Sequence, residues 1–262
     1  MKNFAICYNQ EIENSIAVKD ELFKYLSQKN IAVDVICIDK LKYGYDFIFV
    51  IGGDGTILKA ARFYAKSQTP VFGINLGRLG FLSQSSKENL KIAVDRILND
   101  EYIIEDRIML KSAQYTALND FVIKGCDSGR TSKFSLKIND KFVCDYLADG
   151  IIISTPTGST AYGLSAGGPV LTPSLNAFVV VPICPHTLTA RPIVVPDSEI
   201  FTVYTEESSL VSADGQEFYE TNGGITIQKS DYCAKLVLLK DVDFYSVLRT
   251  KLNWATHPVY HK

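Results

Sequence analysis

A glycine-rich loop with a single carboxylate, Gly52-Gly53-Asp54-Gly55-Thr56, is the sharpest chemical signal in the sequence. It follows an apolar run that indicates a buried strand, and it precedes a helical pattern. Open α/β sheets bind ligands at the carboxyl ends of such strands, and glycines let a phosphate approach the N–H groups at a helix N-terminus. Because phosphates repel a carboxylate, Asp54 indicates Mg²⁺ coordination or contact with an attacking hydroxyl. The alternative is that Asp54 caps the helix and the glycines shape a turn.

The sequence lacks the motifs of several other kinds of functional site. Neither a Walker A nor a G-x-G-x-x-G sequence occurs in the chain, which disfavours P-loop and NAD-dehydrogenase sites. G-x-S-x-G, H-E-x-x-H and C-x-x-C are absent, and His186, His257 and His261 do not form a spaced ligand set. Hydrolase triads and zinc chemistry are therefore disfavoured, and we expect no metal site made by protein ligands alone.

Two further segments are rich in glycine or hydroxyl groups. Residues 73–82, GINLGRLGFL, could form a phosphate-facing loop with an aromatic wall, although a plain strand-to-helix connection has the same pattern. Residues 149–169 carry a strand and then five hydroxyl side chains among Ser154 to Thr160. Hydroxyls and glycine amides suit recognition of ribose, carboxamide or phosphate oxygens, and we favour this over a solvated turn.

Two short polar pairs complete the set of candidates. Asn119-Asp120 places an amide beside a carboxylate, which suits contact with ribose hydroxyls but equally suits a hairpin turn. Asp214-Gly215-Gln216 is a turn signal of little weight alone.

The first hundred residues alternate between apolar runs and helical patterns. Strands are predicted at residues 3–8, 31–38, 45–53 and 70–76, and helices at 12–30, 56–67 and 87–100. Nearly continuous apolar strands separated by helices indicate an α/β domain whose parallel sheet is covered by helices on both faces.

After about residue 101 the segments become short, rich in β-branched residues, and broken by Asn-Asp, Pro and Gly. This pattern is typical of an antiparallel all-β domain. Residues 241–254 again indicate a helix, which could return to the first domain. We therefore predict an α/β domain at 1–102, a β domain at 103–240 and a returning C-terminal segment at 241–262, with a site in the cleft between the domains.

Composition sets limits on partners and compartment. The 262 residues carry 27 Lys and Arg against 29 Asp and Glu, and this balance argues against a general nucleic-acid binder. The start shows no secretory pattern, and no apolar run approaches the roughly 20 residues that span a bilayer. The six scattered cysteines suggest buried thiols, so we expect a cytoplasmic protein that binds neither nucleic acid nor membrane.

Taken together, the motifs resemble those of the NAD kinase family, which phosphorylates the adenosine-ribose 2′-hydroxyl of NAD to make NADP. The resemblance runs from about residue 45 to the end. It rests on GGDGT (52–56), GINLGRLGFL (73–82), ALND (117–120), DGIIISTPTGSTAYGLSAGGP (149–169), PHTLTARP (185–192), DGQ (214–216) and KLNW (251–254). GGDGT is shared with diacylglycerol-kinase-like and phosphofructokinase-like enzymes, whereas the long second motif singles out NAD kinases.

The resemblance implies a phosphotransferase that uses ATP or polyphosphate with Mg²⁺, holds NAD between its two domains, and assembles into dimers or tetramers. By motif, Asp54 is implied as the catalytic carboxylate, in a phosphate loop of Gly52, Gly53, Gly55 and Thr56. The implied NAD-binding residues are Asp54, Gly55, Asn119, Asp120, Asp149, Thr160, Ala161, Tyr162, Gly163, Leu164 and Ser165, with Phe81, Arg130, Thr157 and Gln216 as further candidates.

Two positions depart from the family pattern. The family commonly has Asn-Glu where this chain has Asn119-Asp120, and Leu147 stands where a basic residue is frequent. Arg130 is a candidate to replace that phosphate contact. The competing functions are a lipid kinase of the diacylglycerol type, which should show a basic or amphipathic membrane-facing surface, and a non-catalytic dinucleotide sensor.

Overall fold

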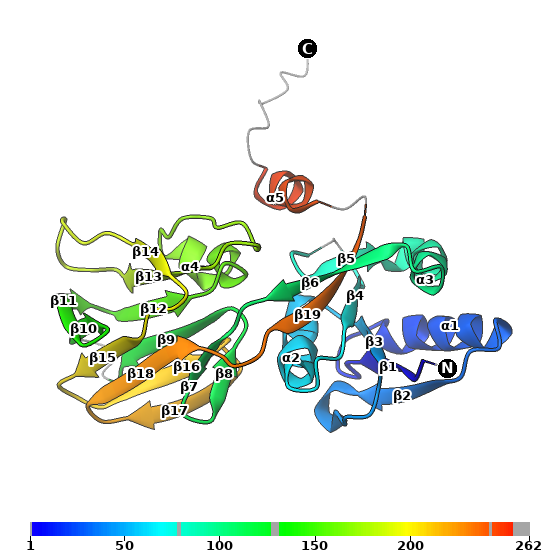
Figure 1. Cartoon of the computed structure of the whole chain (residues 1–262), viewed down its shortest axis with the longest axis horizontal. Helices are drawn as coiled ribbons and strands as arrows, with labels where there is room; N and C mark the ends of the chain where they lie inside the picture. Colours follow the sequence, from blue (N-terminus) through cyan, green and yellow to red (C-terminus); the bar gives the residue numbers. More distant parts are fainter. Residues whose placement is uncertain (1, 78–79, 127–130, 241–242, 254–262) are drawn as a thin grey trace, which may run out of the picture. The chain divides into compact units, whose positions relative to one another are not determined.

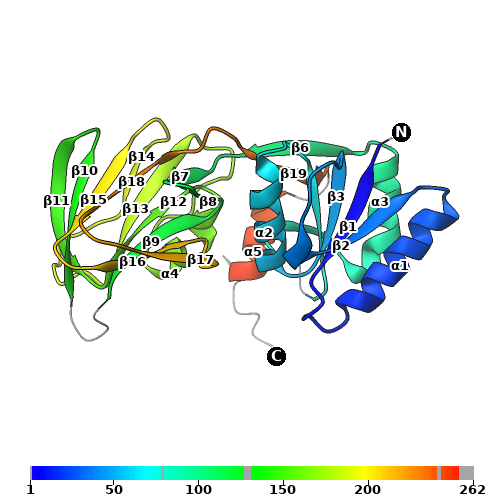
Figure 2. The same ribbon diagram turned by 90° about the horizontal axis from the view of Figure 1, so that it is seen from below.

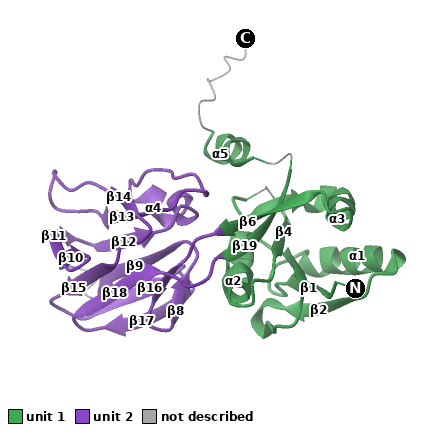
Figure 3. Cartoon of the chain, viewed as in Figure 1, with its two compact units in different colours: residues 1–106, 234–262 green, residues 107–233 purple. Residues whose placement is uncertain are grey.

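The computed structural model describes residues 2–77, 80–126, 131–240 and 243–253. The chain forms two compact units, one of residues 1–106 and 234–262, the other of residues 107–233 (Figure 3). The first unit thus includes β19 (Ala234–Leu239), which lies within the range expected for the β domain. Its run AKLVLL is as apolar as the other strands of that unit, and periodicity alone does not tell which sheet an apolar strand joins.

Unit 1 contains one seven-stranded sheet in the order β2-β1-β3-β4-β19-β6, with β5 also paired to β4. The pairs β1–β2, β1–β3, β3–β4, β4–β5 and β4–β19 are parallel. This confirms the predicted α/β class, because the central strands are buried along their whole length. The other strands of the sheet are β1 (Phe4–Tyr8), β2 (Val33–Cys37), β3 (Phe47–Ile51), β4 (Val71–Asn75), β5 (Ser83–Ser86) and β6 (Tyr102–Arg107).

Helices cover both faces of this sheet, as predicted (Figure 2). Helices α1 (Ser15–Gln28) and α3 (Leu90–Leu98) pack on one face through a shared core that includes Leu22, Val94 and Phe49. Helix α2 (Asp54–Ala65) covers the opposite face, and its Tyr64 is fully buried. The C-terminal helix α5 (Phe244–Leu252) belongs to unit 1 and begins at an Asp243 cap, whose carboxylate accepts the N–H of Ser246 at 3.0 Å.

Unit 2 is built from two six-stranded sheets, in the orders β11-β10-β15-β18-β7-β8 and β14-β13-β12-β9-β16-β17 (Figure 1). All of the strand pairs described in them are antiparallel, which confirms the predicted all-β class. The strands are β7 (Leu110–Ser112), β8 (Tyr115–Ala117), β9 (Asp120–Gly125), β10 (Ser132–Ile138), β11 (Lys141–Ala148), β12 (Gly150–Ser154), β13 (Ala177–Ile183), β14 (Ile193–Pro196), β15 (Phe201–Thr205), β16 (Ser209–Ala213), β17 (Glu217–Thr221) and β18 (Gly224–Lys229).

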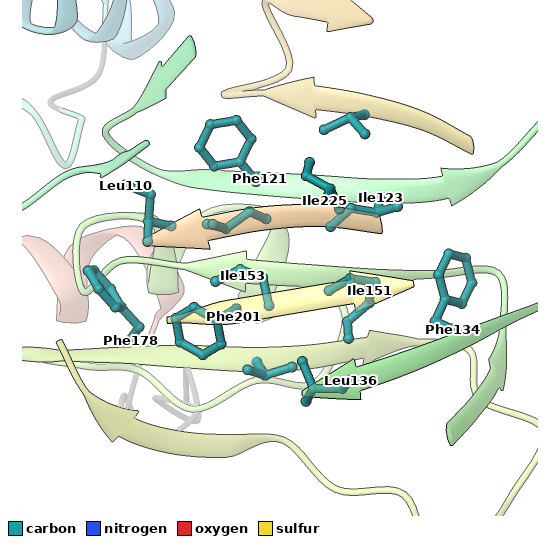
Figure 4. Packing of buried hydrophobic residues seen from close by; sticks show 14 of the residues in the cluster. Leu110, Phe121, Ile123, Phe134, Leu136, Ile151, Ile153, Phe178, Phe201 and Ile225 are labelled. Carbon is teal, nitrogen blue, oxygen red and sulfur yellow. The ribbon is translucent and has the colours of Figure 1, made fainter. Parts of the chain in front are cut away.

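The two sheets share one hydrophobic core, to which alternate residues of each strand contribute. Phe121 and Ile123 of β9 face Phe134, Phe201 and other apolar side chains inside it (Figure 4). The residues between them point outward. Val122 and Ile152 therefore pack in a second, smaller cluster on the outer face of the β9 sheet, where Leu171 also lies.

The chain after β12 crosses this outer face through a 3₁₀ turn at Gly158–Thr160 and a short helix, α4 (Tyr162–Ser165). None of the described helices combines the length and apolar character that a bilayer-spanning helix requires.

Candidate active site

Asp54 is the first residue of α2, directly beyond the carboxyl end of β3. Gly52 is required at the turn because a Cβ there would lie 2.6 Å from the side chain of Thr56. The N–H of Gly52 donates to the carbonyl of Ile74 at 3.0 Å, so the loop stays in register with the neighbouring strand β4. Asp54 thus occupies a helix N-terminus, where backbone N–H groups and the helix dipole favour negative charge.

The carboxylate of Asp54 binds the second glycine motif. It accepts the N–H of Phe81 at 2.9 Å and the N–H of Leu82 at 3.3 Å. A Cβ at Gly80 would lie 1.9 Å from the same carboxylate, so this position is restricted to glycine. The GGDGT and GINLGRLGFL segments are therefore parts of one constellation. The N-cap residue is Gly53 and the Asp54 carboxylate binds residues 81 and 82, so the alternative that Asp54 caps its helix is wrong.

A buried serine supports the loop that holds Asp54. The Ser83 hydroxyl accepts the N–H of Gly80 at 2.7 Å and lies 3.4 Å from the amide nitrogen of Asn75. Asn75 in turn accepts the N–H of Gly77 through its side-chain oxygen at 2.8 Å. Arg78 and Leu79 of the same segment lie outside the described residues.

Unit 2 contains a pocket of about 390 Å³ on the outer face of the β9 sheet. This volume lies in the range of small-molecule sites. The walls combine polar groups at one end with aromatic and aliphatic side chains. The lining residues are Asn119, Asp120, Val122, Lys124, Ala161, Tyr162, Leu210, Ser212, Asp214, Gly215 and Phe218.

The Asp214-Gly215 turn fixes the polar end of this pocket. Both residues have positive φ, 55° and 62°, and lie in the three-residue loop between β16 and β17, where the N–H of Gln216 donates to the Ala213 carbonyl at 3.1 Å. The Asp214 carboxylate accepts three backbone N–H groups, from Leu118 at 3.0 Å, Asn119 at 2.7 Å and Asp120 at 3.2 Å. The turn signal in the sequence is thus correct, and the turn also anchors the Asn119-Asp120 pair.

Hydroxyl groups of the 154–160 loop are used inside the protein. Thr155 donates from its hydroxyl to the Leu118 carbonyl, and Ser154 donates to the Asn119 carbonyl at 3.2 Å. Ser159 lies 2.7 Å from the Pro156 carbonyl and accepts the N–H of Leu171 at 2.9 Å. These three side chains shape the loop and hold it against Asn119, so the interpretation of the hydroxyl run as a recognition surface is wrong for them.

Asp120 is the most perturbed carboxyl group of the pocket. Burial, and to a lesser degree the nearby charge of Asp214, raise the pKa of Asp120 to about 7. An aspartate in an unfolded chain titrates near about 3.9. The folded protein therefore retains a proton that the unfolded chain loses between these two values.

The free energy of unfolding should consequently fall as pH rises from about 4 to 7, by at most about 4 kcal/mol. Asn mimics the protonated carboxyl, so Asp120→Asn should remove this loss and be the more stable protein at pH 8. Urea denaturation of the parent and of Asp120→Asn from pH 4.5 to 8.5 measures the difference in their free energies of unfolding. Asp145→Asn is the control, because Asp145 is exposed. Parallel stability curves for Asp120→Asn and the parent would contradict the assignment.

The pocket brings together four of the predicted NAD-binding residues, Asn119, Asp120, Ala161 and Tyr162. Asp54, Gly55 and Phe81 lie in unit 1. Other predicted residues of unit 2 do not line the pocket: Asp149, Thr157, Thr160, Gly163, Leu164, Ser165 and Gln216. Arg130 lies outside the described residues, and Leu147 is about half exposed on β11.

Sequence reasoning did not identify Lys124, Leu210, Ser212 or Phe218 as pocket residues. The only available signal was alternation: Asp120, Val122 and Lys124 must share one face of their strand. Among the described residues, no three His, Cys, Asp or Glu side chains are grouped so that they could hold a metal ion.

Comparison with known proteins identifies the chain's relatives. Residues 18–102 match the ATP-NAD kinase N-terminal domain family and residues 118–239 the ATP-NAD kinase C-terminal domain family. An NAD kinase of Clostridium botulinum is 38% identical over 275 residues, 98% of both proteins. An NAD kinase of Carboxydothermus hydrogenoformans is 40% identical over 243 residues, 87% of this chain and 86% of that protein.

Solved structures agree with this assignment. The crystal structure of an NAD kinase from Archaeoglobus fulgidus in complex with ATP superposes with a TM-score of 0.84 at 29% identity, covering 96% of this chain and 98% of that one. Yeast NADH kinase complexed with NADH has the same fold, with a TM-score of 0.88 at 23% identity and coverage of 100% and 90%. From the two matched domains and these full-length relatives, the chain belongs to the NAD kinase family of phosphotransferases.

Proposed function

We propose that this NAD kinase transfers the terminal phosphoryl group of ATP, or of polyphosphate, to the adenosine-ribose 2′-hydroxyl of NAD, with Asp54 as the catalytic carboxylate. The observation that carries this proposal is the fixed position of Asp54 at the N-terminus of α2, held by the N–H groups of Phe81 and Leu82. Purified protein incubated with Mg²⁺, ATP and NAD should form NADP, measured with an NADP-specific dehydrogenase. Repeating the assay with polyphosphate in place of ATP identifies the phosphoryl donor, and repeating it with NADH in place of NAD identifies the acceptor.

The proposed step is a direct displacement. The ribose 2′-oxygen forms a bond to the terminal phosphorus while the bond from that phosphorus to the leaving phosphate oxygen breaks, which releases ADP from ATP. A carboxylate is a far weaker base than an alkoxide, so Asp54 accepts the hydroxyl proton only as the new bond forms. Its main contribution is to orient the hydroxyl for attack.

The residues around Asp54 fit a Mg²⁺ ion that arrives with the donor phosphates. Mg²⁺ is commonly held by one or two carboxylates together with substrate oxygens and water, and the Asp54 oxygens keep acceptor capacity beyond their two N–H bonds. When bound, the ion would neutralise charge on the transferring phosphoryl group. The N–H groups of Gly53 and Asp54 are proposed to face those phosphates, whereas those of Gly52 and Thr56 donate to the carbonyls of Ile74 and Gly53.

The pocket of unit 2 is proposed to hold NAD, with Asn119 and Asp120 at the ribose hydroxyls and Tyr162 against an aromatic ring. The volume, the apolar walls and the polar end of the pocket support this role. Asp149, Thr160 and Ser165 remain proposed NAD contacts outside the pocket walls.

The ribose assignment predicts the effect of one substitution. At pH 8, where Asp120 with its pKa of about 7 is mostly ionised, Asp120→Ala should raise KM for NAD by roughly 10- to 100-fold, which corresponds to about 1.5–3 kcal/mol for hydrogen bonds to a charged group. Steady-state kinetics with NAD as the varied substrate measures this. Asp145→Ala, on an exposed strand of the same unit, is the matched control. An unchanged KM for Asp120→Ala would leave Asn119-Asp120 with a purely structural role at the start of β9, which is not a hairpin turn because β8 and β9 belong to different sheets.

We also propose that the protein is a cytoplasmic dimer or tetramer without nucleic-acid or membrane partners. Exposed apolar side chains such as Phe142 and Val194 on strands β11 and β14 support self-association, and the net charge of −2 gives no general attraction to polyanions. Light scattering during gel filtration would give the number of subunits.

A further inference from the structure

The pocket of unit 2 runs along a row of residues on the outer face of three neighbouring strands. Asp120, Val122 and Lys124 alternate along β9 and therefore point to the same side. Ser212 of β16 pairs with Val122, and Leu210 pairs with Lys124. Phe218 of β17 pairs with Ser212 and also lines the pocket. The register thus gives the pocket a long axis parallel to β9.

The two ends of this axis carry opposite charge. Asp120 and Asp214 form one end. Lys124 lies four residues farther along β9, roughly 14 Å away at the rise of an extended strand. Val122 stands between them on β9, and the apolar side chains of Leu210 and Tyr162 lie at the Lys124 end.

The Lys124 ammonium is positioned by an aromatic ring and not by an acid. Its Nζ lies 5.0 Å from the centre of the Tyr162 ring, and no ion pair with another described residue is present. Glu220 is in the same row, but it pairs with Leu210 and is two strands, roughly 10 Å, away from Lys124. A cation held against an aromatic face keeps its N–H donors available for an anion.

We propose that Lys124 forms an anion subsite of this pocket and makes it select phosphorylated nucleosides. The inference rests on the proposed function of the pocket and adds the direction in which a ligand lies in it. Ribose hydroxyls donate to the acidic end, the base lies along Tyr162 and Phe218, and a phosphate ester on the ribose reaches Lys124. A 5′-phosphate and a 2′-phosphate share this chemistry, and the test separates them.

Calorimetric titration of the full chain with adenosine, 5′-AMP and 2′-AMP tests this assignment. One or both monophosphates should bind about 10-fold more tightly than adenosine, and the preferred ester identifies the phosphate that reaches Lys124. In Lys124→Met that preference should disappear while adenosine affinity stays within about two-fold. Lys124→Arg should restore it, because guanidinium keeps both the charge and the stacking.

The chain offers a closely matched control. Lys137 of β10 has its Nζ 5.0 Å from the ring of Tyr204, outside the pocket, so Lys137→Met removes an equivalent cation–π contact without touching the site. It should leave the preference for the phosphate esters intact. Monophosphates that bind no better than adenosine, or a preference that survives Lys124→Met, would overturn the anion subsite. If the pocket did not hold the ribose as proposed, Asp120→Ala would bind adenosine as tightly as the parent. That result is distinct from the loss of the phosphate preference, so the two failures can be told apart.

Discussion

Asp54→Asn is expected to lower kcat by about 10²- to 10⁴-fold, the range typical of a lost acid–base group. The dissociation constant for NAD should change by no more than about three-fold, because the carboxylate is proposed to act on the reacting hydroxyl and not to supply ground-state affinity. The structural reason is local. Asp54 accepts two backbone N–H groups and retains further acceptor positions, whereas an amide has one acceptor oxygen.

Single-turnover kinetics together with calorimetric NAD binding would measure the two quantities separately. Asp39→Asn is a suitable control. Asp39 is an exposed carboxylate of unit 1 and forms an ion pair with Lys59, which lies on α2, the helix that begins at Asp54. Its kcat should remain near that of the parent. If Asp54→Asn turned over at a comparable rate, the catalytic assignment would be lost and Asp54 would be reduced to tethering the 80–82 loop.

Gly158→Ala is expected to cost about 3 kcal/mol or more of unit 2 stability, because no flexible group can move aside. A Cβ at this position would lie 2.1 Å from the Asn119 carbonyl oxygen and 2.6 Å from the Ser154 hydroxyl. Both neighbours belong to the network that holds the 154–160 loop on the Asn119-Asp120 segment. Relief of the overlap requires the backbone of Asn119 to move, so NAD binding should weaken as well.

Gly163→Ala provides the matched comparison, in the same stretch of chain. A Cβ there would find its nearest neighbour at 3.7 Å, an ordinary contact, and Gly163 lies within a helical turn. Its stability should change by less than about 0.5 kcal/mol. Urea denaturation followed by circular dichroism compares the two variants, and equal midpoints would contradict the packing assigned to Gly158.

Much of the architecture follows from the order of apolar runs. FIFVI and VFGIN are buried on both sides, and such continuity indicates parallel strands without any knowledge of tertiary contacts. The strand β5, with sequence SQSS, could not be found in this way because it contains no apolar residue. Its buried Ser83 and Gln84 bind backbone groups of residues 80 and 239, contacts that only the tertiary fold creates.

The site was predictable to a similar degree. Glycines and a carboxylate beyond β3 drew attention to Asp54, yet nothing in the spacing of residues 54 and 80–82 shows that they touch. The pocket wall from β16 and β17 is set by strand pairing across more than 80 residues, and Leu210 and Phe218 carry no motif. For the hydroxyl residues of the 154–160 loop, the sequence suggested ligand contacts that the structure does not support. Composition cannot tell whether a serine hydroxyl faces a ligand or binds the backbone.

Strand β19 has a consequence for how the chain matures on the ribosome. It occupies an interior place in the first sheet, between β4 and β6, although roughly 130 residues of unit 2 are translated between β6 and β19. Strand β5 already pairs with β4 at Gly73 to Asn75, but the place of β19 beside Val71 and next to β6 stays unfilled for roughly 6–26 s at about 5–20 residues per second. Exposed strand edges recruit other strands, so the nascent chain is most vulnerable to aggregation during this interval, and a chaperone would be most useful there.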